Sequence, residues 1–166
     1  MFDSILLCTH GTNGARRAEE LVFGELIRKK PDLKVTILTI IDRDWQSMTG
    51  DDWLNSSKTH ATFLDYVEDQ MARENSEDWQ RIQERFPAAE EATFVSRVGA
   101  IEETIARQAS SGGHDLIVLG PQRKTRRLFN LDMEKGLRSR IDMLLLHALL
   151  PCPLLIAPCT KSDQTG

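Results

Sequence analysis

The sequence predicts an α/β fold: a single domain built on an open parallel sheet with helices on both faces. Short apolar runs that resemble strands alternate with helical patterns along the whole chain, which favours parallel strands joined by right-handed crossovers. The length of 166 residues is that of one domain. We therefore expect one domain over residues 1–159, followed by a disordered tail at residues 160–166.

Five apolar runs are expected to form the strands, at residues 4–9, 33–41, 92–98, 115–120 and 153–158. The first, second and fourth runs are nearly continuous in Ile, Leu and Val, which is typical of strands covered on both faces. The third run alternates instead, with Phe94 and Val98 on one side and Arg97 on the other. This alternation suits an edge strand.

Apolar residues at spacings of three and four predict the helices between these strands. The long interval at residues 42–91 is expected to begin as an irregular excursion, in which Trp45 and Trp53 either pin a loop or cap a cleft. It then becomes a long acidic helix, since residues 65–91 carry nine acids against three bases. The helical stripes are Ala15, Ala18, Val22 and Leu26; Phe63, Val67 and Met71; Trp79, Ile82 and Phe86; Ile101, Ile105 and Ala109; and Leu137, Ile141, Leu145 and Ala148.

Composition argues against several classes of protein. The net charge is −4, and no run of 18 apolar residues could cross a membrane. The three cysteines form neither an even disulfide set nor a CxxC pair, and Cys8 lies in an apolar run where a buried, inert thiol is expected. Because the start of the chain has no basic segment before its first strand, we expect a cytoplasmic protein without a membrane partner. The scattered histidines predict no metal site.

Two strand ends carry the residues from which a ligand site could be built. Open α/β sheets bind ligands beyond the carboxyl ends of their strands. The loop at residues 9–14 adds glycines and a helix N-terminus, which favours anions, and the loop at residues 120–127 adds four cationic side chains. If the two strands are neighbours, these loops face one crevice; the alternative is that both are plain turns. The candidate ligand-binding residues are Thr9, His10, Gly11, Thr12, Ile41, Asp42, Gly120, Arg123, Lys124, Arg126 and Arg127.

Two longer segments give the chain a family resemblance. The stretch "GAIEETIARQASSGGHDLIVLG" at residues 99–120, followed by "HALLPCPLLIAP" at residues 147–158, resembles the universal stress protein family. That resemblance implies a five-stranded parallel sheet in the order 3-2-1-4-5, with the first and fourth strands side by side. It also implies a homodimer formed through the last strand, residues 153–158. A monomer whose edge is covered by the tail is the alternative.

The resemblance also implies that a nucleotide site of this family is altered here. Members that bind ATP carry Gly-x-x-Gly, nine residues, and then Gly-Ser or Gly-Thr after the fourth strand. In this chain Gly120 matches the first glycine, but Arg123 and Met133 occupy the positions of the other two, and His10 stands where binders usually carry Asp. A side chain forced into a glycine conformation costs about 1–3 kcal/mol. We therefore expect a degraded ATP site.

The function expected from these features is binding rather than catalysis. The leading interpretation is a non-enzymatic regulatory protein of the stress response, with no certain cofactor. The alternative is a protein that binds ATP, AMP or another phosphate ligand through the cations at 123–127. A catalytic role would need His10 as base, Asp42 to orient it, and Cys8 or a water as nucleophile, which is a weak pattern. Nucleic acid is not expected as a partner, because Phe129 is the one aromatic residue among the basic residues at 123–140 and base stacking needs more.

Overall fold

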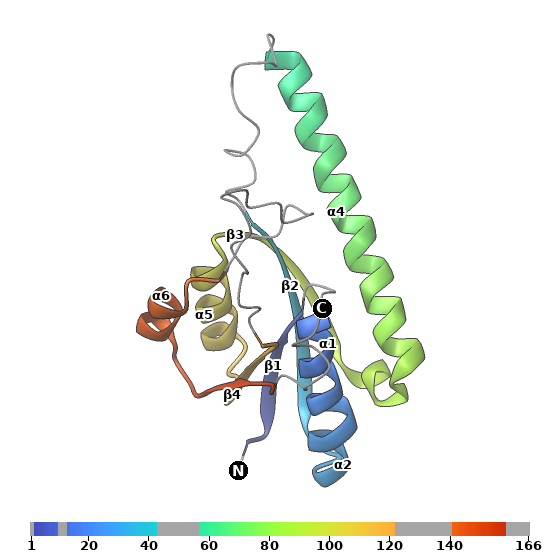
Figure 1. Ribbon diagram of the computed structural model, residues 1–166, viewed down its shortest axis with the longest axis vertical. Coiled ribbons are helices and arrows are strands. Elements are labelled where there is room, and N and C mark those ends of the chain that lie inside the picture. Colours follow the sequence, from blue (N-terminus) through green and yellow to red (C-terminus); the bar gives the residue numbers. More distant parts are fainter. Residues whose placement is uncertain (1, 10–12, 43–56, 122–140, 159–166) are drawn as a thin grey trace, which may run out of the picture.

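The computed structural model describes residues 2–9, 13–42, 57–121 and 141–158 (Figure 1). The described residues do not include Trp45, Trp53 or the segment 123–140, which is rich in Lys and Arg. The expected tail also lies outside them. Within the described part, strands and helices alternate as predicted. None of the described helices is both long enough and apolar enough to cross a membrane.

Five parallel strands form one sheet in the order β3-β2-β1-β4-β5, which confirms the expected topology. The strands are β1 (Ser4–Cys8), β2 (Lys34–Asp42), β3 (Thr93–Gly99), β4 (Leu116–Leu119) and β5 (Leu154–Ile156). Leu7 of the central strand pairs with Ile37 of β2 and with Val118 of β4. The carboxyl ends of β1, β2 and β4 therefore meet at one edge of the sheet.

Helices cover both faces of the sheet (Figure 1). On one face α1 (Asn13–Glu19) continues into a π-helical segment, η1 (Glu20–Leu26), and then into α2 (Ile27–Lys29), with α4 (Ser57–Arg85) beside it. A short 3₁₀ helix, η2 (Pro87–Glu91), follows α4. On the other face lie α5 (Ile101–Ser111) and α6 (Met143–Leu149).

Alternating residues of the inner strands divide the core into two halves, as strands covered on both faces require. Ile5, Leu7, Ile37 and Val118 face α1 and α4 with Val22 and Ile82, whereas Leu6, Leu38, Ile117 and Leu119 face α5 and α6 with Ile105 and Leu146. The buried inner strands were therefore correctly read from their apolar runs. The individual strand ends differ from the predicted ones by one or two residues.

The long helix α4 is fixed to the body near its carboxyl end. Ile82 is fully buried, the Trp79 ring stacks on Phe94 of β3 at 5.0 Å, and Phe86 stacks on Phe23 of η1 at 5.5 Å. The amino-terminal part of α4 extends past the carboxyl edge of the sheet (Figure 1). This arrangement confirms the long acidic helix and places it on the same side as the expected crevice.

The predicted stripe of the last helix is wrong. It assigned Leu145 and Ala148 to the buried face, but both are exposed, Leu145 by 46%, whereas Leu146 is fully buried. The helix begins only after Asp142, whose side chain accepts hydrogen bonds from the backbone N–H groups of Leu144 and Leu145. Such an N-cap fixes where the first turn starts and so which leucine turns inward. Leu137, the first residue of that stripe, lies outside the described residues.

Candidate functional site

The loops that follow β1 and β4 converge at the carboxyl edge of the sheet. The two strands are adjacent and parallel, so both loops leave from the same edge. At that edge the backbone of Gly120 lies against the first turn of α1: a Cβ atom added to Gly120 would be 2.2 Å from the carbonyl oxygen of Gly14. A Cβ atom added to Gly14 would be 2.7 Å from the carbonyl oxygen of Pro121. The two segments are therefore in direct backbone contact.

This backbone contact explains why positions 14 and 120 are glycine without any role for a ligand. Neither has a backbone conformation reserved for glycine, because the one described glycine with positive φ is Gly113. What they provide is space, since a side chain at either position would press on main-chain atoms. Gly120, which the sequence suggests as part of a phosphate cradle, is required at this position by packing alone.

Four of the predicted site residues belong to the described part of the chain. Thr9 follows β1 directly, and its backbone N–H donates to the carbonyl oxygen of Leu38 at 3.0 Å. Ile41 is 7% exposed near the end of β2, and the backbone of Asp42 pairs with Gly99 of β3. Gly120 completes the set. The remaining candidates lie outside the described residues, namely His10, Gly11, Thr12, Arg123, Lys124, Arg126 and Arg127.

The hydroxyl of Thr9, a candidate ligand-binding residue, is bonded inside the molecule. Its side chain is only 3% exposed, and its hydroxyl donates a hydrogen bond of 2.7 Å to Oε1 of Glu19. The side chain thus points toward the face covered by α1 and α4. Thr9 therefore borders the crevice through its backbone, while its hydroxyl is used inside the molecule.

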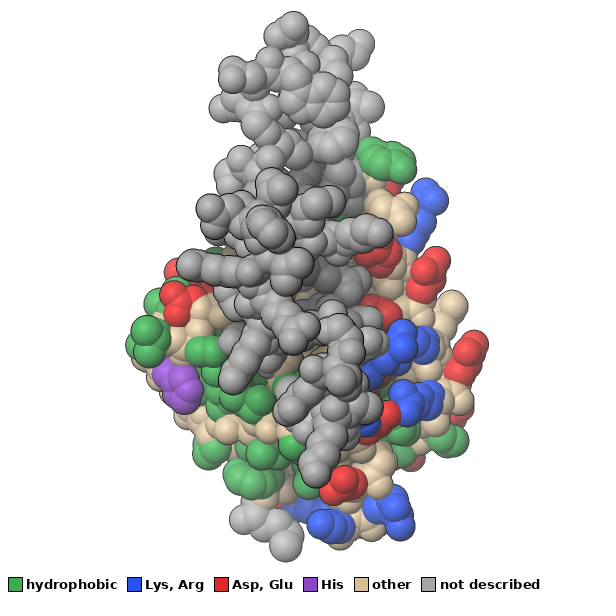
Figure 2. Space-filling model, in the orientation of Figure 1, with side chains coloured by type: hydrophobic (Ala, Val, Ile, Leu, Met, Phe, Trp, Pro, Cys, Tyr) green, Lys and Arg blue, Asp and Glu red, His purple; other side chains and the backbone are tan. Residues whose placement is uncertain are grey.

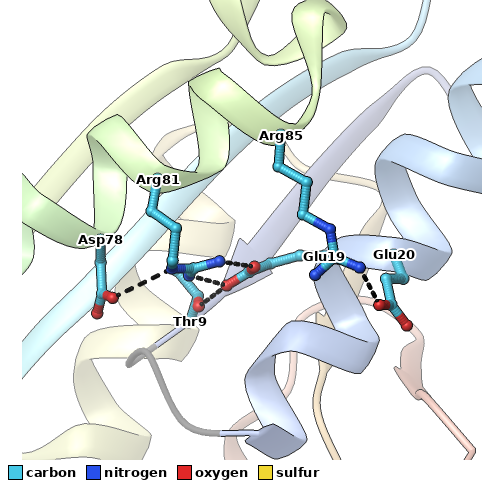
Figure 3. Close-up of polar contacts among 6 residues, drawn as sticks. All are labelled: Thr9, Glu19, Glu20, Asp78, Arg81 and Arg85. Atoms are coloured by element: carbon cyan, nitrogen blue, oxygen red, sulfur yellow. Dashed lines mark hydrogen bonds and ion pairs between the residues drawn. The ribbon is translucent and has the colours of Figure 1, made fainter.

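Glu19 is the centre of a buried polar cluster that the sequence did not reveal (Figure 3). The residue is 0% exposed at the end of α1. Arg81 of α4 donates two hydrogen bonds of 2.9 Å to the two oxygens of its carboxylate. Such a paired geometry matches the planar guanidinium to the carboxylate and is among the stronger ionic contacts in proteins. The Glu19 hydrogen bonds raise the pKa of Arg81 above its usual value.

A second ion pair lies one helical turn farther along α4. Arg85 contacts Glu20 (Figure 3). Glu20 also accepts a hydrogen bond of 2.8 Å from Arg17. Consecutive glutamates thus meet two arginines that are four residues apart. Glu20 opens the π-helical segment η1, whose altered winding accompanies this double contact. This second pair is more exposed than the first. The exposed fractions of the side chains are 33% for Glu20 and 46% for Arg85, against 0% for Glu19 and 26% for Arg81.

One further hydroxyl lies buried beside this cluster. Thr39 follows Leu38, the β2 residue that pairs with Cys8, and so it is the cross-strand neighbour of Thr9. Thr39 is 1% exposed, and its Oγ1 has no hydrogen-bond partner among the described residues. At the carboxyl ends of β1 and β2, the sheet face that α1 and α4 cover is therefore polar, although the rest of that face is apolar.

A signal for Glu19 is present in the sequence. It lies four residues after Ala15 and three before Val22, which puts it on the apolar stripe of the first helix. An acid in that position has to be paired or hydrated. The identity of its partner could not be read from spacing, because Arg81 is 62 residues away in the chain.

The catalytic alternative named Cys8 or a water as the nucleophile, and Cys8 belongs to the described part of the chain. The Cys8 thiol is half-buried against the apolar core on the α5 and α6 face, and its desolvation raises its pKa to about 12. It is therefore protonated at neutral pH, and only the thiolate is a good nucleophile. The raised pKa agrees with the inert thiol expected from the apolar run, but the side chain is half-buried and not fully buried as expected. Among the described residues, no three His, Cys, Asp or Glu side chains are grouped so that they could hold a metal ion.

A separate polar cluster joins β1 to β4 at the opposite, amino edge of the sheet. Asp115 accepts hydrogen bonds from the backbone N–H groups of Asp3 and Ser4, at 2.9 and 3.0 Å. The Ser4 hydroxyl lies 2.8 Å from Nδ1 of His114, which is 8% exposed. Burial lowers the pKa of His114, with Asp115 acting in the opposite direction. These hydrogen bonds stabilise the amino end of β1, whereas the candidate site lies at the carboxyl ends of the strands.

Exposed apolar side chains are grouped near α6 and β5. Figure 2 shows hydrophobic side chains on the α6 side of the molecule, whereas charged side chains dominate the α4 side. Leu144 is 86% exposed on α6, and Leu155 and Ile156 are 36% and 43% exposed on the edge strand β5. The opposite edge strand, β3, exposes Val98 by 52% among polar neighbours.

Comparison with known proteins identifies the fold and the family. No curated protein sequence matches the chain. Among solved structures, the hypothetical protein MJ0577 is 18% identical, with 97% of this chain and 99% of that chain covered and a TM-score of 0.69. An Arabidopsis thaliana universal stress protein family protein with AMP bound is 11% identical, over 96% and 94% of the two chains, with a TM-score of 0.60. A universal stress protein in complex with cAMP is 15% identical, over 96% and 99%, with a TM-score of 0.56.

These likenesses are to the fold, which agrees with the strand order and the two helical layers. The model of the universal stress protein family matches residues 1–158, which is nearly the whole chain. By that match, this chain belongs to the universal stress protein family.

Proposed function

We propose that this protein acts in the stress response by binding, without catalysis, and that its crevice no longer accommodates a triphosphate. The observation that supports a crevice is the backbone contact between Gly14 and Gly120, which brings the loops after β1 and β4 together at the carboxyl edge. This is the edge at which open α/β sheets bind ligands. The loss of the triphosphate cradle is inferred from Arg123 and Met133, which occupy the glycine positions of ATP-binding members.

A second candidate function is binding of a nucleotide with a single phosphate. Two of the similar structures contain AMP and cAMP, each with one phosphate group. A monophosphate needs fewer main-chain contacts than a triphosphate, and arginine side chains can supply them through charged hydrogen bonds of about 1.5–3 kcal/mol each. Arg123, Lys124, Arg126 and Arg127 are the cations that this candidate would use in place of glycines.

Thermal unfolding with separate nucleotides distinguishes these functions. A ligand at 100 times its Kd adds about 2.7 kcal/mol to the free energy of unfolding. For a chain of this length, that increase corresponds to a rise in Tm of roughly 5–11 °C. We expect millimolar AMP or cAMP to raise the Tm if the second candidate is right, and ATP with magnesium to raise it less.

Two variants and two outcomes make this test decisive. Arg123→Ala should abolish a shift caused by AMP, whereas Arg28→Ala, an exposed cation on α2 at the opposite edge of the sheet, should leave it unchanged. No shift with any adenine nucleotide eliminates the second candidate. A larger shift with ATP than with AMP contradicts the loss of the triphosphate cradle.

We infer that the protein is a homodimer formed through β5. The edge strand exposes Leu155 and Ile156, and unpaired apolar edges favour strand pairing. Native mass spectrometry should give twice the chain mass of 18.8 kDa, and Ile156→Lys should give the monomer. Val98→Lys on the other edge strand is the matched control and should remain dimeric. A monomeric wild-type protein would instead favour an edge covered by the chain's own tail.

We also infer a cytoplasmic location. Cys8 and Cys152 are free cysteines within the described residues, which suits a reducing compartment. Fractionation of cells that express the tagged protein would check this, and recovery in a membrane or secreted fraction would contradict it.

A further inference from the structure

The buried cluster at Glu19 joins three elements that border the crevice. Thr9 is the residue at which β1 ends, Glu19 closes α1, and Arg81 belongs to α4 (Figure 3). The amino-terminal turn of α1 is the part that touches Gly120. The ion pair between Glu19 and Arg81 therefore contacts the residue that follows β1 from the α4 side, and the same α1 helix contacts Gly120 with its first turn.

We propose that Arg81 is a positioning residue for the crevice, acting through Glu19 on Thr9 and on the start of α1. The proposal rests on the function proposed above, in that a ligand is bound at the carboxyl edge. It adds that α4, which lies outside the strand ends, takes part in shaping that site. Arg81 itself is engaged with Glu19, so we assign it no contact with the ligand.

The physical basis is the burial of the Glu19 carboxylate. Among the described residues, its contacts are the Thr9 hydroxyl and the two Arg81 hydrogen bonds. A buried carboxylate that loses its cation has to become hydrated or take up a proton. Either change alters the group to which the Thr9 hydroxyl donates. Within the described part of the chain, the Thr9 backbone donates its N–H to the carbonyl oxygen of Leu38, and this hydrogen bond should weaken when the hydroxyl loses its partner.

The neighbouring pair, Glu20 with Arg85, supplies a matched control. It joins the same two helices, again through one glutamate and one arginine. It is more exposed, Glu20 has Arg17 as a second partner, and the described contacts of this pair do not include Thr9. Loss of Arg85 should therefore weaken the attachment of α4 without changing the end of β1.

The test compares Arg81→Met with Arg85→Met by hydrogen exchange of the ligand-free protein. For Arg81→Met we expect amide exchange at Thr9 and in residues 13–18 to rise by about ten- to a hundredfold, the change expected for loss of a charged hydrogen bond. For Arg85→Met the rise should be confined to η1 and α4. Equal exchange at Thr9 in the two variants, or no rise in Arg81→Met, would overturn the proposal.

A second pair of variants covers the case in which Arg81→Met does not fold. Arg81→Lys keeps the positive charge but loses the paired geometry, so the protein should fold with a smaller increase in Thr9 exchange. Arg85→Lys should leave Thr9 exchange unchanged. An Arg81→Lys protein with wild-type exchange at Thr9 would contradict the proposal.

Nucleotide affinity then separates this proposal from the proposed function. If AMP binds the wild-type protein, its Kd should rise by about tenfold or more in Arg81→Met, following the loss of a preorganised edge, and remain near wild type in Arg85→Met. An unchanged Kd in Arg81→Met would refute the link to the site. If no nucleotide binds the wild-type protein, the nucleotide-binding candidate fails, whereas the ligand-free exchange still decides whether Arg81 positions Thr9.

Discussion

Replacement of Gly120 by alanine is the direct test of the convergence on which the crevice depends. The added Cβ would lie 2.2 Å from the carbonyl oxygen of Gly14, 2.4 Å from the Gly14 carbonyl carbon and 2.7 Å from the backbone nitrogen of Ala15. All three are main-chain atoms of the first turn of α1. No side-chain rotation can relieve such contacts, so the loop or the helix has to move.

The expected effect follows from the cost of inserting a methyl group into a packed contact. Overpacking destabilises proteins by about 1–3 kcal/mol. For a chain of this length, each kcal/mol lowers the Tm by about 2–4 °C, so Gly120→Ala should lower it by roughly 2–12 °C. Urea unfolding followed by circular dichroism would give the free energy change directly, and differential scanning calorimetry would give the Tm.

Gly24→Ala is the matched control for this variant. Gly24 lies in the helical segment η1, and an added Cβ there meets no atom within 4 Å. Alanine in a helix is favoured over glycine, so this change should stabilise the protein by about 0.5–1 kcal/mol. A Gly120→Ala protein as stable as wild type would refute the close contact of the two loops, and with it the shared crevice.

Three other properties follow from buried groups. Because burial lowers the pKa of His114 in the folded protein, the unfolded chain binds more protons as the pH falls below about 6.5, and stability is lost in that direction. The stability difference between wild type and His114→Gln should therefore be largest near pH 8 and narrow toward pH 5 in urea titrations; a widening difference would indicate a charged imidazole in the fold. Ile82→Ala, at a fully buried position, should cost about 2–5 kcal/mol in urea unfolding, and a loss well below this range would contradict its role in fixing α4. A protein with Cys8 as its only cysteine should react with a thiol reagent at pH 8 far faster once unfolded, because the half-buried thiol packs against the core and has a pKa of about 12 in the fold; equally rapid reaction of the native protein would contradict that packing.

The sheet was predictable because its strands are buried on both faces. Runs such as Ile5–Leu7 and Leu116–Leu119 are apolar at every position, and the structure buries these residues without exception. The order of the strands is a different matter. Apolar runs carry no information about which strand neighbours which, so the order came from the family resemblance, and the structure confirms it.

The register of α6 shows where periodicity fails. The segment from Met143 to Leu149 contains four leucines, so several helical faces are almost equally apolar. The choice among them is made by Asp142, whose side chain caps the first turn. Its backbone N–H in turn donates to Glu102 of α5 at 2.6 Å. The cap could have been read from the sequence, since Asp before an apolar run is a helix-start signal, whereas the contact with Glu102 is tertiary.

The candidate site was predictable in its position but not in its internal contacts. Thr9 and Gly120 were expected at one edge because they follow strands that the family order makes adjacent. The pairing of Glu19 with Arg81 could not be expected, because a pair between separate helices has no fixed spacing. The hydrogen bond from the Thr9 hydroxyl to Glu19 was not expected either, and it leaves the Thr9 backbone as the part of this residue that lies at the strand end.

The contact between Gly14 and Gly120 bears on how a nucleotide site can be recognised in a chain of this fold. A glycine that is needed to let two backbones approach will be present whether or not a ligand is bound. Gly120 therefore supports the fold and carries little weight as a sign of phosphate binding, although it matches the first position of the ATP-binding pattern. The discriminating positions are those of Arg123 and Met133, since we propose that side chains there exclude the close main-chain cradle that glycine would allow. Restoring glycine at both positions should then raise affinity for ATP with magnesium while leaving stability without ligand nearly unchanged. Failure of this double variant to gain ATP binding would mean that the altered loop is not what excludes the triphosphate.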